Sequence, residues 1–375
     1  MKNSSQSPVY VTRPDLPPLD DFTEYLKQIW DSKMLTNNGP FHQQFEKMLA
    51  DYLGVKYLSL FANGTLALVT ALQTLRITGE VITTPFSFVA TTHALWWNNI
   101  RPVFADIEPV YFNLDPEKVE AAITPQTTAI MPVHVYGNPC RVDELQKIAD
   151  TYGLRLIYDA AHAFGVRING NSILNYGDLS VLSFHATKAF NTIEGGAIIC
   201  HDEQTKHRID LLKNFGFMDE TIVVEPGINA KMNEIQAAYG LLQLRSVETN
   251  ISKRKKAAEE YRLRLRAVQG LRVFEDIEGV VHSYTYFPVL INKERFGRSR
   301  EEVYTTLRQN NIFSRRYFYP LISQFPSYSG LLSSRPGNLP VAEHVAEEVL
   351  CLPLFSELQP ETIDRICDLI LGKRL

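Results

Sequence analysis

Short apolar runs alternate with longer amphipathic or polar stretches over the first two-thirds of the chain. Seven of these runs combine β-branched, aliphatic and aromatic residues at a length typical of strands: 57–61, 81–85, 101–106, 128–135, 155–160, 179–185 and 196–201. Several runs are apolar without alternation, as expected of strands that are buried on both faces. We therefore predict an α/β fold with a mostly parallel, seven-stranded sheet that is covered by helices.

The clearest helical spacing precedes the first of these strands. Apolar residues recur at helical positions between about Gln43 and Leu53, and Gly54 follows at the position of a C-cap. Another helical stretch is expected near Asp20 to Trp30, after a polar N-terminal arm.

The pattern changes past Gly240, where a long, charged helix is predicted as a connector. A strand-like run at 284–291, a helix near 300–309 and a terminal helix after Pro360 follow it. We predict two domains on this basis. They are a large α/β domain with the N-terminal arm over residues 1–240, and the connector helix with a smaller α+β domain over residues 241–375.

Composition narrows the class of ligand. The chain has 375 residues, and its 38 basic and 42 acidic side chains are spread evenly, so it carries no basic footprint for nucleic acid or an anionic membrane. No apolar window reaches the length of a membrane span, and the first ten residues hold no signal-peptide core. The four cysteines lack metal-ligand spacing. We expect a cytoplasmic protein with reduced thiols, no bound metal and a small-molecule ligand.

Candidate chemistry lies just after the predicted strands, because ligands of α/β sheets bind at the carboxyl ends of strands. Gly64 and Thr65 open a helix after the strand at 57–61, so their backbone N–H groups and a hydroxyl form a cradle for phosphate. An ordinary turn with Thr65 as the N-cap explains the same residues. Phe88 offers a ring that stacks on a flat ligand, or it belongs to the core.

Two titratable groups follow later strands. Asp159 ends an apolar strand, and a buried carboxylate there needs a partner such as a pyridinium nitrogen. The alternatives are an N-cap role for Asp159 and a core position for His162. Lys188 comes soon after Ser183, and burial there lowers the pKa of a lysine so that it forms an imine with an aldehyde. A surface lysine in a loop is the other interpretation.

Together these motifs resemble one family. The set ANGTLAL, TTPFSFVATTHA, ADIEPVYFNLDPE, PVHVYGNPC, DAAHAFG, SFHATK, EGGA and GINAKMNEIQAAYG is similar to the DegT/DnrJ/EryC1/StrS sugar aminotransferases. The match runs over about residues 30–240 and continues more loosely beyond them. The resemblance implies a fold-type I aminotransferase that depends on pyridoxal 5′-phosphate (PLP).

The resemblance also implies roles for individual residues. Lys188 matches the Schiff-base lysine that moves protons, Asp159 matches the partner of the pyridinium nitrogen, and Phe88 matches the ring that stacks on the cofactor. Asn229 matches an asparagine that reaches the phosphate of the other subunit, which implies a homodimer with shared active sites. The phosphate-binding positions are Gly64, Thr65 and Ser183.

The same resemblance indicates a substrate. His162 replaces the glutamine of many enzymes that aminate C3 of the sugar, and is similar to enzymes that aminate C4. We expect ping-pong transfer of an amino group from L-glutamate to dTDP-4-keto-6-deoxy-D-glucose, giving dTDP-4-amino-4,6-dideoxy-D-glucose for O-antigen or lipopolysaccharide biosynthesis. The alternatives are a C3 aminotransferase acting on a 3-keto sugar nucleotide, and a PLP-binding regulatory protein without catalysis. Candidate nucleotide contacts, which otherwise form a solvated loop, are Arg315, Arg316, Tyr317 and Tyr319.

Overall fold

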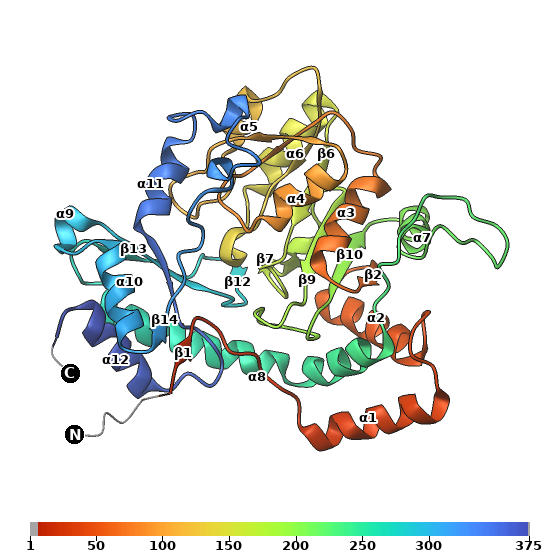
Figure 1. The fold of residues 1–375 in the computed structure, drawn as a ribbon, viewed down its shortest axis with the longest axis horizontal. Helices are drawn as coiled ribbons and strands as arrows, with labels where there is room; N and C mark the ends of the chain where they lie inside the picture. Colours follow the sequence, from red (N-terminus) through yellow and green to blue (C-terminus); the bar gives the residue numbers. More distant parts are fainter. Residues whose placement is uncertain (1–6, 374–375) are drawn as a thin grey trace.

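The computed structural model describes residues 7–373, so the first six residues of the predicted N-terminal arm lie outside the described part. A body built around a large sheet is flanked by a smaller unit that contains α10 (Arg300–Gln309) and α12 (Pro360–Ile370) (Figure 1). The long helix α8 (Glu234–Leu265) runs beneath both.

All seven predicted strands pair in one sheet, in the order β2-β10-β9-β6-β5-β3-β4. Only β10 is antiparallel to its neighbours, so the other six strands point the same way and the prediction of a mostly parallel sheet is confirmed. Their carboxyl ends meet at one edge. The strands are β2 (Tyr57–Phe61), β3 (Glu80–Thr83), β4 (Arg101–Phe104), β5 (Thr127–Met131), β6 (Arg155–Asp159), β9 (Leu179–Ser183) and β10 (Gly196–Cys200).

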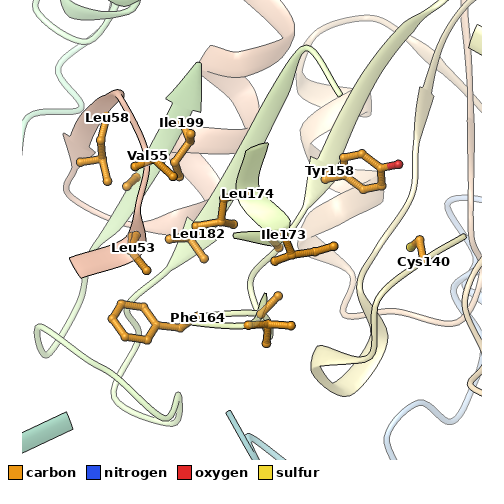
Figure 2. Close-up of a cluster of buried hydrophobic side chains, with 14 of the residues drawn as sticks. Leu53, Val55, Leu58, Cys140, Tyr158, Phe164, Ile173, Leu174, Leu182 and Ile199 are labelled. Atoms are coloured by element: carbon orange, nitrogen blue, oxygen red, sulfur yellow. The ribbon is translucent and has the colours of Figure 1, made fainter. Parts of the chain in front are cut away.

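Helices cover both faces of this sheet because successive strand residues are apolar. Leu182 and Val181 of β9, for example, belong to two different cores. Each such aliphatic side chain contributes about 1.5–3 kcal/mol when it is removed from water. Figure 2 shows part of the first core, with Leu58 and Ile199 among its members. The first face packs against α2 (Pro40–Leu53), α6 (Val142–Tyr152) and the start of α8, and the second against α3 (Gly64–Thr74), α4 (Ala90–Trp97) and α7 (Glu203–Leu212).

Two helix predictions on the N-terminal side are confirmed. The stretch near Asp20 to Trp30 is α1 (Leu19–Ser32). Helix α2 ends at Gly54, whose left-handed φ of 67° favours glycine and whose N–H bonds to the carbonyl groups of Ala50 and Asp51.

The C-terminal unit is a three-stranded antiparallel sheet with helices packed against it. Helix α10 and the terminal helix α12 are found where they were predicted, whereas the strand predicted over 284–291 begins at Phe287. The remaining elements of this unit are β11 (Leu271–Val273), β13 (Phe287–Ile291), β15 (Val349–Leu352), α9 (Lys293–Phe296) and α11 (Pro340–Glu348).

Helix α8 passes without interruption through the predicted domain boundary at residues 240/241. It begins at a capping box formed by Asn233 and Gln236. Its first turns, including Leu241, pack into the core of the large sheet, and its last turns, including Leu265, pack into the C-terminal core. The position of the boundary therefore stays a prediction.

The N-terminal arm and an aromatic cluster also connect the two units. Strand β1 (Val9–Tyr10) pairs in parallel with β14 (Ile312–Phe313) of the C-terminal unit. Phe86 of the large unit packs edge-to-face against Phe318 of the C-terminal unit. Within residues 7–373, no helix is long and apolar enough to cross a membrane. The smaller elements are α5 (Pro116–Ala121), β7 (Arg167–Ile168), β8 (Asn171–Ser172) and β12 (Val280–Val281).

Candidate active site

A cavity of about 620 Å³ opens at the carboxyl edge of the parallel strands. Asn63, Ser87 and Ser183 line it from the segments at or just after β2, β3 and β9, while Asp159 ends β6. Tyr317 enters it from the C-terminal unit. The cavity therefore lies where the sequence placed the ligand, and both units build its wall.

Asp159 is buried at the floor of this cavity, with 4% of its surface exposed. Its Oδ2 accepts a hydrogen bond from the Thr91 hydroxyl at 2.7 Å, and its Oδ1 accepts from the Ala161 N–H at 3.0 Å. Burial raises the pKa of Asp159, and these two donors and the Lys188 ammonium offset the rise only in part. No helix follows Asp159, so the N-cap interpretation is wrong.

Lys188 lies in the loop between β9 and β10 and also lines the cavity. Burial lowers the pKa of its amino group to about 8, and Asp159 counteracts this only partly. The Nζ atom lies 5.7 Å from the centre of the Tyr286 ring. About a tenth of such a lysine is a neutral nucleophile at pH ~7, far more than for a lysine with an ordinary pKa.

The first turn of α3 faces the same cavity. Asn63 is the N-cap, and its side chain accepts from the Leu66 N–H at 2.9 Å, so the alternative with Thr65 as the N-cap is wrong. The preceding N–H groups, on Gly64 and Thr65, have no acceptor within the helix and are suited to an anion. A Cβ atom at Gly64 would lie 2.8 Å from the Cβ atom of Ser183. Only glycine therefore allows α3 to begin this close to the end of β9.

His162 and Phe88 form part of the wall. The His162 ring is stacked on Phe318 and meets Tyr286 edge-to-face, and its Nδ1 accepts a hydrogen bond from the Tyr136 N–H at 3.3 Å. Burial, reinforced by Lys188, lowers the pKa of His162 well below its ordinary value. The ring is therefore neutral with its proton on Nε2. Phe88 is 58% exposed, which leaves its ring available to a ligand.

These side chains fit PLP. The helix N-terminus beside Gly64 suits a phosphate, and the close packing of Gly64 against Ser183 places the serine hydroxyl beside it. The buried carboxylate of Asp159 needs a cationic partner such as a pyridinium. Lys188 supplies an amine whose pKa permits reaction with an aldehyde.

Four of the predicted site residues do not line the cavity. Arg315 and Asn229 are exposed. Arg316 pairs with Glu301 at 2.9 Å, and the ring of Tyr319 lies 4.5 Å from the guanidinium of Arg300. Arg316 and Tyr319 thus contact α10, and the predicted roles of all four stay predictions. The predicted residues that line the cavity are Gly64, Thr65, Phe88, Asp159, His162, Ser183, Lys188 and Tyr317.

Several cavity residues were not predicted from the sequence. Thr91 donates a hydrogen bond to Asp159. In the sequence, this role was indicated only by the position of Thr91 in the motif that was selected for its aromatic residues. Tyr286 lies in a run interpreted as a strand, so nothing in the sequence pointed to the cavity. His185 and Glu194 face each other at 3.5 Å across the lysine loop.

Comparison with known proteins assigns the family. The model of the DegT/DnrJ/EryC1/StrS aminotransferase family matches residues 19–371. The dTDP-4-amino-4,6-dideoxy-D-glucose transaminase of Escherichia coli is 53% identical over 366 residues, which cover 97% of this chain and 98% of that protein. The transaminase of the same name from Shigella dysenteriae is 49% identical, with 97% and 99% covered.

A solved structure agrees with this assignment. The crystal structure of DesI in the presence of its TDP-sugar product superposes with a TM-score of 0.93 at 37% identity, covering 98% of this chain and 93% of DesI. The chain belongs to the DegT/DnrJ/EryC1/StrS aminotransferase family and is a PLP-dependent sugar aminotransferase.

Proposed function

We propose that this enzyme transfers an amino group from L-glutamate to C4 of dTDP-4-keto-6-deoxy-D-glucose, giving dTDP-4-amino-4,6-dideoxy-D-glucose. One observation carries the proposal: a lysine with a lowered pKa and a buried aspartate face one cavity, in a chain 53% identical to a transaminase of that name. The identity extends over nearly the full length of both proteins, which favours C4 over C3 and catalysis over a purely regulatory role.

Asp159, Phe88 and the start of α3 would hold PLP, whose protonated ring, when bound, withdraws electrons from the carbon that loses a proton. Asp159 would keep the ring nitrogen protonated, and Thr91 and the Ala161 N–H fix the orientation of its carboxylate. Phe88 would offer its ring to the flat face of the cofactor, and Gly64, Thr65 and Ser183 would hold the phosphate.

Lys188 is the group that moves the proton. With a pKa of about 8, its amine accepts a proton from the substrate carbon and returns it at low cost near neutral pH. In the first half-reaction the amino group of glutamate would stay on the bound cofactor, and the rest of the substrate would leave as 2-oxoglutarate. The sugar carbonyl receives the amino group in the second.

His162 donates a hydrogen bond into the site. Because Nδ1 accepts from the Tyr136 N–H and burial keeps the ring neutral, Nε2 carries the only proton. A donor at this position would be available to an oxygen anion on the bound cofactor ring. The stack with Phe318 helps to hold the His162 ring in place.

Four residues of one loop are proposed to bind the nucleotide of the sugar. Tyr317 lines the cavity and is the nearest of them to the chemistry. Arg315 is exposed and is free to reach a diphosphate, whereas Arg316 and Tyr319 must first leave their contacts with α10.

We propose a homodimer in which each subunit completes the site of the other. Asn229 is exposed, at the end of a segment with unusually exposed apolar side chains. Such an apolar surface is typical of a protein interface. The exposed apolar residues of this segment are Phe215, Phe217, Met218, Ile222, Val223, Val224 and Ile228.

The product belongs to O-antigen or lipopolysaccharide biosynthesis in this proposal, because activated amino sugars are building blocks of polysaccharides. We place the enzyme in the cytoplasm, since its reaction needs free L-glutamate and a nucleotide sugar in the same compartment.

The test is incubation of the enzyme with PLP, L-glutamate and a panel of 3-keto and 4-keto sugar nucleotides, with the amino position of each product determined by NMR. We expect the amine at C4 of the dTDP-linked sugar. An amine at C3 contradicts the proposed substrate, and no amine with any sugar contradicts the proposed activity.

A further inference from the structure

Tyr136 lies between the large unit and the loop that carries the proposed nucleotide contacts. It belongs to the short helical turn η1 (Val135–Gly137) and is 1% exposed. Its φ of 57° is left-handed, a conformation that is rare for an aromatic residue and persists only where the surrounding structure enforces it. Such positions cluster at functional sites, and this one lies directly behind the cavity wall formed by His162 and Phe318.

The two ends of Tyr136 contact different parts of that wall. Its backbone N–H donates to Nδ1 of His162 at 3.3 Å. Its hydroxyl donates a hydrogen bond to the carbonyl of Tyr317, and its ring is stacked on Phe318 with the two centroids 6.0 Å apart. One residue thus joins the side chain that is proposed to face the cofactor to the loop that is proposed to face the nucleotide.

Residues 315–319 form this nucleotide loop, and both units fix it. The N–H of Arg315 donates to the carbonyl of Cys351 in β15 at 3.1 Å, and the N–H of Cys351 donates to the carbonyl of Arg315 at 2.7 Å. Two residues farther along, the Tyr136 hydroxyl holds the carbonyl of Tyr317 from the side of the large unit. Tyr317 is also the loop residue whose side chain was assigned nearest to the chemistry, so this hydrogen bond fixes the loop where it enters the cavity.

We propose that Tyr136 is a positioning residue for the sugar-nucleotide half-reaction, acting through its hydrogen bond to Tyr317. The inference rests on the proposed role of the nucleotide loop. The nucleotide supplies binding energy at a distance from the sugar carbonyl, so the loop must hold it at a fixed place relative to Lys188. Glutamate carries no nucleotide and reacts without this contact. The hydroxyl of Tyr136 therefore acts in one half-reaction and not in the other.

The experiment compares Tyr136→Phe with the wild-type enzyme, both loaded with PLP. Phenylalanine keeps the ring against Phe318 and the N–H that bonds to His162, and it removes only the hydroxyl. Stopped-flow absorbance gives the rate constant and the half-saturating concentration of each half-reaction, first with L-glutamate and then with dTDP-4-keto-6-deoxy-D-glucose. An equilibrium titration with dTDP gives the affinity for the nucleotide alone.

We expect the half-saturating concentration of the sugar nucleotide and the dissociation constant of dTDP to rise about 5- to 20-fold, because the carbonyl that orders the loop loses its donor. The rate constant and the half-saturating concentration for glutamate should stay within about twofold of the wild type. A hydroxyl that only stabilised the fold would not separate the two half-reactions.

Tyr261→Phe is the matched control. Tyr261 is also fully buried, and its hydroxyl also donates to one carbonyl, that of Pro353 at 3.0 Å. It lies in the C-terminal core and does not line the cavity. Its variant loses a buried hydrogen bond of the same kind and should react like the wild type with both substrates.

Hydrogen exchange followed by mass spectrometry tests the loop itself. The peptide that contains residues 315–319 should exchange faster in Tyr136→Phe and at the wild-type rate in Tyr261→Phe. Equal losses in both half-reactions, an unchanged affinity for dTDP or unchanged exchange would overturn the inference. A wild-type enzyme that reacts with glutamate but not with the sugar nucleotide would instead overturn the proposed function, and the exchange rates would still decide whether Tyr136 holds the loop.

Discussion

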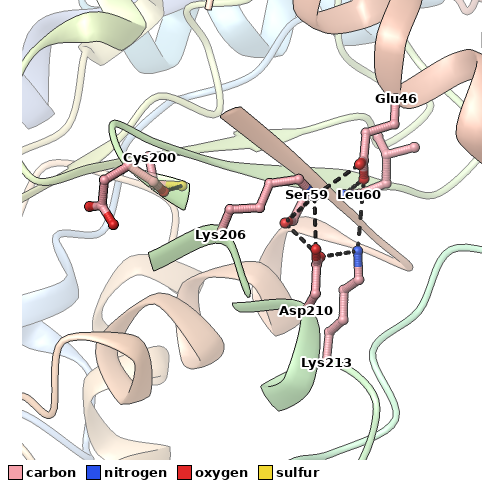
Figure 3. A network of polar contacts seen from close by, with 8 residues as sticks. Glu46, Ser59, Leu60, Cys200, Lys206, Asp210 and Lys213 are labelled. Carbon is pink, nitrogen blue, oxygen red and sulfur yellow. Dashed lines mark hydrogen bonds and ion pairs between the residues drawn. The ribbon is translucent and has the colours of Figure 1, made fainter. Parts of the chain in front are cut away.

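Two partly buried lysines of the large unit have opposite chemistry. Burial lowers the pKa of Lys188 to about 8, with only partial compensation by Asp159. Burial also acts to lower the pKa of Lys206 in α7, but Glu46 and Asp210, each 2.9 Å from its Nζ, outweigh it and the pKa is raised (Figure 3). Desolvation is common to both residues. In these two partly buried residues, the number of carboxylates at contact distance separates the reactive lysine from the structural one.

The aspartates of the two regions differ in the same way. Burial raises the pKa of Asp159, whose direct partners are one hydroxyl and one N–H. Burial acts in the same direction on Asp210, but Lys213 and Lys206 lower its pKa to about 2. In the cavity, Asp159 and Lys188 thus lack a full set of charged partners. In the network beside β2, each carboxylate of Glu46 and Asp210 pairs with lysine.

The largest expected effect is on catalysis. Lys188→Ala should lower turnover by at least about 10⁴-fold, because it removes both the covalent link and the proton carrier. Lys206→Ala should leave turnover within about threefold and lower the free energy of unfolding by about 1 kcal/mol, since it removes one of the two lysines that pair with Glu46 and Asp210 at a partly exposed site. Steady-state assays and denaturant titrations check both. Similar activity losses in the two variants would remove the distinction between the lysines.

The aspartates provide the next contrast. Asp159→Asn should slow the reaction about 10²- to 10³-fold, because the ring nitrogen loses its charged partner. The PLP-free variant should be no less stable than the wild type at pH ~7, because the raised pKa shows that ionised Asp159 destabilises the fold. Asp210→Asn should show full activity and reduced stability. The account fails here if Asp159→Asn retains wild-type kinetics.

These contrasts involve residues that the sequence identified only in part. Asp159 and Lys188 were predicted because both follow apolar runs, and the sequences of parallel strands that are buried on both faces are apolar throughout. An apolar run does not show in which direction its strand will pair, so the antiparallel orientation of β10 could not be predicted. The start of α8 had a readable signal in the capping box of Asn233 and Gln236, which the prediction of a connector past Gly240 did not use.

Contacts between the two units could not be predicted from local patterns. Tyr286 and Phe318 reach the cavity because the C-terminal unit packs onto the large one, and nothing near them in the sequence encodes that packing. The contacts of Arg316 and Tyr319 with α10 depend on the same tertiary arrangement. Sequence motifs thus identified the part of the site at the carboxyl edge of the sheet, and Tyr317 was the one predicted cavity residue from the C-terminal unit.

The pH dependence of PLP capture sharpens the contrast between the lysines. The neutral amine is the reactive form, so the rate at which PLP-free enzyme develops visible absorbance should rise with pH and level off above about 8. Stopped-flow mixing at a series of pH values measures it. A rate that still rises at pH ~10 would show a lysine with an ordinary pKa.

The smallest expected effect is on acid stability. The pKa of Asp210 is about 2 in the folded protein, below its ordinary value of 3.8, so its contribution is present above that value and lost as the pH falls. Between pH ~5 and ~3 the wild type should lose up to about 1 kcal/mol more stability than Asp210→Asn, and solvent screening makes the difference smaller than this upper bound. Urea titrations at the two pH values measure the difference, and equal losses would show that Asp210 is not stabilised by its lysines.

The most direct test of the central claim is to identify the lysine that bonds to the cofactor. The PLP-loaded enzyme is reduced with borohydride, digested and examined by mass spectrometry for the peptide that carries the cofactor. We predict a single modified site at Lys188, with Lys206 and Lys213 unmodified. Modification at any other lysine, with Lys188 free, would contradict the assignment on which the proposed function depends.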